Sequence, residues 1–370
     1  MSRTTENVIE RPRREYAQSD ATRNDHSTGT FNLGFFTQVR GTREQVPAEV
    51  YSRLTDAIVA ADELGYESVW LGQHHFEGEW GRMPSPLVFL ASVAAQTKRI
   101  QIGTAVSVLP FEDPLRLAED AAVLDTISGG RVNIGLGGGS GGDDTFRAFG
   151  LTQETRRQAF DQKLDVLIRA LEGQEVPADG SNRTLQPNAP GLRERLWHSV
   201  GSTQRAREAA RAGNNLLIGS FHDHALYDQL PQIQAYLEEW QDQEHERRPR
   251  IGALRFVYWG RDKADVERLV TESLPRFQSK IGGEFPDLAA MDPADYLERV
   301  TRYGSPTDVV DSLRSDPALF GYATDFIPSF SLYPAAGETT LGEELSIENL
   351  EFFAREIAPQ LGWEGTGGRD

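Results

Sequence analysis

Residues 100–136 decide the fold, and they read IQIGTAVSVLPFEDPLRLAEDAAVLDTISGGRVNIGL. The β-branched run from Ile100 to Val106 predicts a buried strand, and the segment from about Pro114 to Ile127 predicts a helix. Arg131 to Leu136 predicts the next strand. A strand, a helix and a second strand in this order indicate a parallel sheet with helical crossovers. We therefore expect an α/β fold.

The same alternation continues on both sides of this stretch. Upstream, strands are predicted at Phe31–Phe36 and Ser68–Gly72, with a helix between them. Downstream, the predicted strands are Leu196–Val200, Asn215–Ile218, Ile251–Trp259 and Asp325–Phe330, with helices at about Thr203–Ala212 and Ile347–Ile357. These segments bring the predicted strands to eight, and eight βα units predict a closed (β/α)₈ TIM barrel.

The barrel is predicted to form one domain that spans residues 31–363. Residues 1–30 are polar and mix arginines with acids without apolar periodicity, which predicts a flexible extension. The stretch from about 274 to 300 is the least periodic part of the second half, and we interpret it as an insertion in the barrel. Residues 364–370 are predicted to be a tail.

The composition excludes several classes of function. The chain has 370 residues, a formal net charge of -18 and no cysteine. The charge argues against nucleic acid or an anionic membrane as a partner, because both require clustered Lys and Arg. A chain without cysteine has no disulfide, no thiolate metal site and no catalytic thiol. No apolar segment approaches a membrane span and no secretory signal is visible, so we expect a cytoplasmic location.

Two histidines follow the second predicted strand. In a TIM barrel the active site lies at the C-terminal ends of the strands, so His74 and His75 fall at the barrel mouth. An imidazole there can act as a general base near neutral pH. Because side chains alternate along an extended segment, only one of the two faces the site, and we favour His74 as the catalytic residue. A pair of exposed or packing histidines is the alternative.

A glycine-rich loop follows the fourth predicted strand and includes Gly137, Gly138 and Gly139. Such glycines let the backbone approach a flat ring or a phosphate closely. The spacing formally matches the dinucleotide fingerprint, but Asp143 and Asp144 follow in place of an apolar helix start. We therefore favour a bulky ligand over a Rossmann NAD site, and a flexible loop without a ligand is the alternative.

A third candidate lies where the fifth predicted strand ends. Gly201, Ser202 and Thr203 precede a helix, and the free N–H groups of a capped helix can hold a phosphate. Arg157, near the start of the preceding helix, can add a cationic contact. Helix capping alone and a solvated helix face are the alternatives for these residues.

A metal hydrolase is a competing interpretation. His222 and His224 follow the sixth predicted strand and, with the two histidines after the second, offer four imidazoles. Barrel hydrolases of that kind usually carry His-x-His on the first strand, where this chain has only Thr37 and Gln38. We predict no metal site.

Several long segments, in the same order, resemble the bacterial luciferase-like monooxygenases. The resemblance is carried by residues 65–76 (GYESVWLGQHHF), 97–110 (TKRIQIGTAVSVLP), 114–120 (PLRLAED), 124–131 (LDTISGGR) and 146–150 (FRAFG). It is dense from about residue 31 to 172 and thinner from there to the end.

The resemblance implies a flavin-dependent monooxygenase, usually dimeric, that binds FMN. In that family, reduced FMN and dioxygen give a C4a-peroxyflavin that oxidises a small organic substrate, and a separate flavin reductase is expected as a partner. His74 matches the catalytic histidine, and Ala105–Val106 matches a pair whose peptide bond, often cis, supports the flavin ring. Gly201, Ser202 and Arg157 match phosphate-binding positions, while the loop after the fourth strand lies along the flavin.

The sequence also departs from luciferase itself. Gly137 and Gly138 stand where luciferase has a cysteine and a phosphate-contacting arginine, and Arg205 replaces a hydroxyl side chain. We interpret Arg205 as a candidate substitute for the missing arginine. These changes argue against light emission and long-chain aldehyde specificity. Two alternatives stay open, an F420-dependent oxidoreductase of the same fold and a non-catalytic flavin-binding relative.

Overall fold

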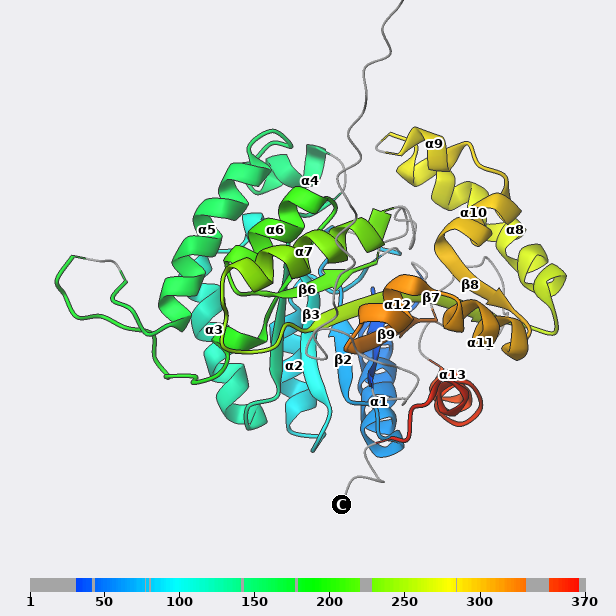
Figure 1. Ribbon diagram of the computed structural model, residues 1–370, viewed down its shortest axis with the longest axis horizontal. Helices are drawn as coiled ribbons and strands as arrows, with labels where there is room; N and C mark the ends of the chain where they lie inside the picture. The colour runs from blue at the N-terminus through cyan, green and yellow to red at the C-terminus, as the bar shows by residue number, and fades with distance from the viewer. Residues whose placement is uncertain are drawn as a thin grey trace, which may run out of the picture.

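The protein is an (β/α)₈ barrel in the computed structural model (Figure 1). The structure describes residues 31–41, 44–76, 78–79, 81–140, 143–176, 179–219, 228–283, 285–330 and 346–365. All strand pairs are parallel, and the pairing of the sixth strand with the seventh closes the sheet on itself. The barrel strands are β1 (Asn32–Thr37), β2 (Ser68–Leu71), β3 (Gln101–Val108), β4 (Val132–Gly137), β5 (Leu196–Ser199), β6 (Asn215–Ile218), β7 (Ile251–Trp259) and β9 (Asp325–Ser329). The predicted closed barrel is therefore confirmed.

Helices surround the strands, and their ends follow from proline and glycine. Proline, which fixes a helical φ, opens α1, α2 and α3, and glycines in the left-handed region end α1 and α3, at Gly65 (φ 91°) and Gly129 (φ 72°). The surrounding helices are α1 (Pro47–Leu64), α2 (Pro86–Ala94), α3 (Pro114–Ser128), α5 (Arg156–Leu171), α6 (Thr203–Arg211), α7 (Leu230–Asp242), α11 (Pro306–Arg314), α12 (Pro317–Tyr322) and α13 (Ile347–Phe352).

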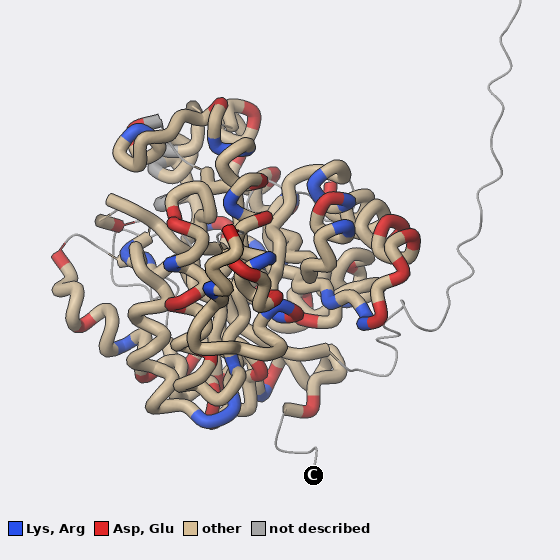
Figure 2. Tube along the Cα trace, turned by 90° about the vertical axis from the view of Figure 1, so that its left-hand side faces the viewer, with Lys and Arg blue, Asp and Glu red and all other residues tan. Residues whose placement is uncertain are grey.

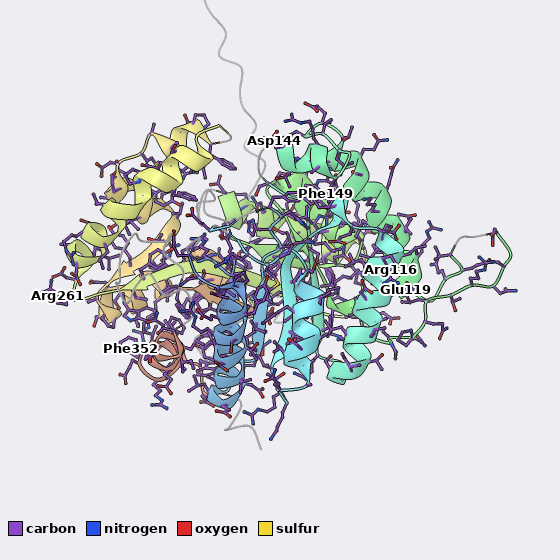
Figure 3. All side chains as sticks on the ribbon, turned by 180° about the vertical axis from the view of Figure 1, so that it is seen from behind. Arg116, Glu119, Asp144, Phe149, Arg261 and Phe352 are labelled. Atoms are coloured by element: carbon purple, nitrogen blue, oxygen red, sulfur yellow. The ribbon has the colours of Figure 1, made fainter. Side chains whose placement is uncertain are left out.

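The last helix is tied to the end of β7. The ring of Phe352 stacks on Trp259 with centroids 5.4 Å apart and planes 20° apart, and Figure 3 labels Phe352 on α13. The chain then leaves α-helical geometry in a π-helical turn over Phe353–Ile357 and a 3₁₀ turn over Ala358–Leu361. The sequence predicted one helix to Ile357, so only its final turn differs.

The inside of the barrel has a small core of its own. It consists of strand residues from five barrel strands, namely Phe36, Trp70, Trp197, Leu217 and Ile327. The rings of Trp70 and Trp197 meet edge to face at 5.3 Å. Gly103 is needed beside them, because a Cβ there would come within 3.0 Å of Trp70. Two indoles thus pack against each other inside the barrel.

An added lobe lies between β7 and α11 and appears at the upper right of Figure 1. Its elements are α8 (Lys263–Ile281), α9 (Pro286–Ala289), α10 (Pro293–Val300) and β8 (Thr301–Gly304). β8 pairs with the end of β7 outside the closed barrel. The lobe has a separate core that includes Val270, Tyr296 and Leu297. The fold therefore carries an insertion in its second half, but β8 was not predicted.

Charges on the surface are mixed in sign. Figure 2 shows Lys and Arg interspersed with Asp and Glu along the chain. On α3, Arg116 pairs with Glu119 at 2.6 Å and with Asp120 at 3.0 Å. Within the described part of the chain, every helix is too short or too polar to span a membrane. The predicted extension over residues 1–30 lies outside the described residues.

Candidate active site

The C-terminal ends of the parallel strands lie together at one end of the barrel, which we call the mouth. This end is the upper one in Figure 1, where α4 (Asp143–Ala148) follows β4 and the lobe lies beside it. Ala105 and Val106, near the end of β3, are partly buried and pack on the inner core of the barrel. They therefore form part of an apolar floor at the mouth.

The two histidines after β2 point to different neighbours. His75 packs into a group of aromatic rings, with centroids 4.7 Å from Phe149 and 5.6 Å from Phe111. Its Nε2 atom is buried without a hydrogen-bond partner, and burial lowers the pKa of the imidazole, partly offset by the carboxylate of Glu112. The ring of His74 instead lies against Gly81, where a Cβ would come within 2.3 Å of its Cγ. The catalytic role of His74 stays a prediction.

Gln73 connects three segments at the mouth, which the sequence did not predict. Its side chain is buried, accepts a 2.6 Å hydrogen bond from the N–H of Val108 and donates one of 2.6 Å to Glu112. Its Nε2 also donates to the carbonyl of Pro84, and its backbone N–H donates to that of Val106. Gln73 thereby fixes the end of β3 next to His74. A polar residue at the end of a buried strand was the available signal.

The peptide bond between Ala105 and Val106 is cis, as the resemblance implied. The pairing of β3 with β4 shifts register between Thr104 and Ser107 at this point. Val106 packs against Gly137, where a Cβ would lie 2.4 Å from its Cγ2. Gly137 is therefore needed for the contact between the two strands.

The glycine loop leaves open space. A Cβ on Gly138 would meet no atom within 4 Å, whereas Gly139 has a φ of 79° that favours glycine. The loop is held from one side because Arg156 donates a 3.1 Å hydrogen bond to the carbonyl of Gly139. Gly138 can thus admit a ligand, and residues 141–142 of the loop lie outside the described residues.

The start of α6 has the geometry of a capped helix. The Ser202 hydroxyl accepts a hydrogen bond from the N–H of Arg205 at 3.3 Å. Gly201, Ser202 and Thr203 are exposed, and a Cβ on Gly201 would meet nothing within 4 Å. The first N–H groups of a helix have no partners within the helix itself. An anion therefore has both donors and space here.

Both candidate arginines are held by carboxylates. Arg205 contacts Asp161 and Glu208, each at 2.6 Å, and Arg157 contacts Glu208 at 3.3 Å. Below them His198 is buried next to the ring of Phe160, which Arg205 also covers. The structure thus brings Arg157 and Arg205 together beside the start of α6, but as members of an ion-pair cluster.

The histidines do not form a metal centre within the described residues, which contain no group of three or more potential metal ligands. His222 and His224 lie outside the described residues.

Aromatic side chains line the rim near β2 and β4. Phe76 is 77% exposed and Phe149 is 36% exposed. Phe149 stacks on Phe111 with centroids 4.5 Å apart and planes 14° apart. Figure 3 labels Phe149 near Asp144 of α4. The mouth therefore offers an apolar surface beside the glycine loop.

Comparison with known proteins gives a family match. The sequence model of the family described as luciferase-like monooxygenase matches residues 31–319. The alkanal monooxygenase alpha chain of Photobacterium leiognathi is 35% identical over 149 residues, 40% of this chain and 41% of that one. The oxygenase component of the flavin-dependent trigonelline monooxygenase of Acinetobacter baylyi is 25% identical over 246 residues, 63% of this chain and 66% of that one. The chain thus aligns with less than two thirds of either relative.

Solved structures share the fold. The oxygenating constituent of 3,6-diketocamphane monooxygenase from Pseudomonas putida, in complex with FMN, superposes with a TM-score of 0.67 at 17% identity. That match covers 89% of this chain and 98% of the other. An F420-dependent secondary alcohol dehydrogenase has a TM-score of 0.68 at 14% identity, with 90% and 99% covered. At these identities the likeness concerns the fold alone.

Proposed function

The chain belongs to the luciferase-like monooxygenase family, and from this we propose that it oxidises a small organic substrate with reduced FMN and dioxygen. The observation that carries the proposal is the family match over residues 31–319, on a barrel whose mouth has an apolar floor and open glycine positions. The chemistry with oxygen belongs to the flavin, and the protein contributes binding, orientation and exclusion of water.

The residues at the mouth fit a flavin in three respects. Ala105 and Val106 offer an apolar surface for a planar ring. Gly138 and Gly201 leave room where any larger side chain would project. The capped start of α6 offers N–H donors to a phosphate. We assign the flavin ring to the apolar floor and its phosphate to Gly201, Ser202 and Thr203. The loop over Gly137–Gly139 is proposed to lie along the flavin between these two positions.

His74 is the residue proposed to handle a proton at the reacting end. An imidazole can accept or donate a proton near neutral pH, and catalytic pKa values near the working pH serve this best. Gln73 holds the neighbouring backbone through Val106 and Val108. The proposed role of Gln73 is therefore to position His74 relative to the floor.

The aromatic rim supports a substrate with an apolar part. The exposed rings of Phe76 and Phe149 can cover such a substrate and keep water from the flavin. His75 lies behind these rings, and its lowered pKa favours the neutral imidazole. We propose that His75 supports the apolar wall and takes no part in proton transfer.

A reductase and a second copy of the chain are the proposed protein partners. The relative named as an oxygenase component supports a separate reductase.

Exposed apolar residues on two adjacent helices support a homodimer. Val88 of α2 is 75% exposed, and Val123 and Ile127 of α3 are 48% and 57% exposed. Light scattering on the purified protein tests this, since Val123→Asp would shift a dimer to monomer.

The second candidate is an F420-dependent oxidoreductase, which the shared fold favours. The tail of F420 carries carboxylates and requires cations beyond those for one phosphate. Arg157 and Arg205 already pair with carboxylates, which favours FMN.

Anaerobic titration with photoreduced FMN and with reduced F420, followed by mixing with oxygen, tests the proposal. We expect reduced FMN to bind, and its reoxidation to pass through a transient absorbance band whose lifetime is shortened in His74→Ala. His75→Phe is the matched control, because it keeps the aromatic packing and should leave the lifetime close to that of the wild type. Binding of reduced F420 alone, or of neither cofactor, would contradict the proposal.

A further inference from the structure

Two carboxylates form ion pairs with the arginines next to the proposed phosphate position. Glu208 contacts Arg205 at 2.6 Å and Arg157 at 3.3 Å, and Asp161 contacts Arg205 at 2.6 Å. The Arg205 side chain is 19% exposed and that of Glu208 is 27% exposed. These contacts join α5 to α6, because Arg157 and Asp161 lie on α5 and the other two on α6.

The cluster lies within about one helical turn of the phosphate position. Arg205 donates its backbone N–H to the hydroxyl of Ser202, so it belongs to the first turn of α6. Glu208 follows one turn later and also accepts a hydrogen bond from Gln204 at 2.9 Å. A phosphate at Gly201–Thr203 would therefore lie close to two cations, Arg157 and Arg205, and to two anions, Asp161 and Glu208. The net charge of this cluster is zero.

The two carboxylates make the binding free energy of a phosphate less favourable. An arginine that turns to the phosphate must leave a carboxylate or share its donors with it. Glu208 is ionised at neutral pH, since the hydrogen bonds from Gln204 and Arg205 outweigh burial and lower the pKa of its carboxyl. A fixed negative charge within a helical turn of a phosphate repels it and so weakens its binding.

We propose that Glu208, supported by Asp161, competes with the flavin phosphate for Arg157 and Arg205 and so lowers the affinity of this protein for FMN. This inference rests on the proposed function. It gives Glu208 a role in setting flavin affinity, in addition to joining two helices. A flavin that is reduced on another protein must arrive and leave in each cycle, and weakened phosphate binding permits this.

Glu208→Gln tests the inference, because it removes the charge and keeps the shape. Anaerobic calorimetric titrations would compare photoreduced FMN with photoreduced riboflavin, which lacks the phosphate. We expect the variant to bind FMN about 3- to 10-fold more tightly than the wild type does, with riboflavin affinity unchanged. Asp165→Asn is the matched control, because Asp165 also lies on α5 and pairs with Arg169 instead; both affinities should stay constant.

Other results would overturn the inference. FMN affinity that is unchanged or lower in Glu208→Gln would mean that the carboxylate preorganises the arginines, and an equal gain for riboflavin would mean that the phosphate is not involved. Should Glu208→Gln fail to fold, Asp161→Asn tests the same competition at Arg205 and should also favour FMN over riboflavin. A wild-type protein that binds neither flavin would instead refute the proposed function itself.

Discussion

His198 shows what a single buried side chain can do to stability. It lies on β5, is 3% exposed, and its ring is 4.8 Å from that of Phe160. Burial, together with the nearby cation of Arg205, lowers the pKa of His198 to about 4. An unfolded chain would protonate this histidine near its ordinary pKa of about 6.5. The folded protein therefore resists a proton that the unfolded chain accepts.

We predict that His198 makes the protein less stable as the pH falls from about 6.5 towards 4. Over this window the unfolded state binds more protons, so the free energy of unfolding falls by up to about 1.4 kcal/mol per pH unit. Below the folded pKa the loss ends. His198→Phe keeps a ring beside Phe160 and should remove this dependence. Urea unfolding of both proteins at several pH values measures it, and a difference that stays constant with pH would contradict the prediction.

Gln73 leads to a second prediction with the opposite sign. Gln73→Glu would place a second carboxyl group about where the amide now lies 2.6 Å from Glu112. Two carboxyls at this distance share one proton, which raises a pKa in the folded state. Stability should therefore fall as the pH rises from about 4 to 8, and Glu112→Gln in the same chain should restore it. Thermal unfolding at pH 5 and pH 8 measures this, and equal losses at both values would refute it.

At the scale of residues, the sequence predicted different surroundings for His74 and His75 but not the partners of Gln73. The two imidazoles do contact different neighbours, Gly81 and Phe149, and which of them faces the site stays a prediction. The partners of Gln73 lie 35 and 39 positions away at Val108 and Glu112. A local sequence pattern covers only a few residues and cannot reveal partners that are 35 or 39 positions away. The pairing of Arg205 with Asp161 was missed for the same reason.

At the scale of elements, Asp316 joins α12, β7 and β8. Its carboxylate lies at the start of α12 and accepts hydrogen bonds from the N–H groups of Ala318 and Leu319. It also pairs with Arg255 of β7 at 2.7 Å and with Arg302 of β8 at 2.6 Å. Burial would raise the pKa of Asp316, but the two guanidinium groups hold it well below its ordinary value. The lobe and the barrel thus share one buried charge network.

We predict that Asp316→Asn destabilises the protein by about 3 to 5 kcal/mol, since it leaves two arginines buried without a full counter-charge. Ser305→Ala is a suitable control. Ser305 caps the adjacent helix α11 on the surface, and its loss should cost only about 1 kcal/mol. Denaturant unfolding compares the two variants. Equal effects would mean that Asp316 acts as a helix cap alone.

Elements were predictable where the pattern was strong. The helix after β3 was expected at Pro114–Ile127 and spans Pro114–Ser128, because proline and glycine mark both of its ends. β8 was missed because its four residues, Thr301–Gly304, include an arginine and no aliphatic side chain. It is held as a strand by β7, which is a tertiary effect.

For the whole molecule, the count of strands predicted a closed barrel but could not show which residues join its first strand to its last. β1 meets β9, with Asn32 donating a 3.1 Å hydrogen bond to Asp325 across 293 positions of the chain. Arg250, directly before β7, also pairs with Asp325. The sequence predicted an insertion only from about residue 274, whereas the lobe begins with α8 at Lys263, because the apolar spacing of α8 is that of any helix with one buried face.

The separate core of the lobe predicts that the lobe can open while the barrel stays folded. Leu297 lies fully buried in the lobe core with Tyr296, while Leu33 lies fully buried in the main core. A smaller core buries less apolar surface, so amides of α10 should exchange with solvent hydrogen at a lower free energy than those of β1 to β4. Leu297→Ala should lower the opening free energy of the lobe by about 2 to 5 kcal/mol and leave exchange in the barrel nearly unchanged.

Leu33→Ala is the counterpart, because a cavity in the main core should speed exchange in the barrel and in the lobe that depends on it. Hydrogen exchange followed by mass spectrometry under native conditions measures both variants. If Leu297→Ala accelerated exchange in β1 to β4 as much as in α10, lobe and barrel would form one cooperative unit. The shared charge network at Asp316 would then couple the two cores completely.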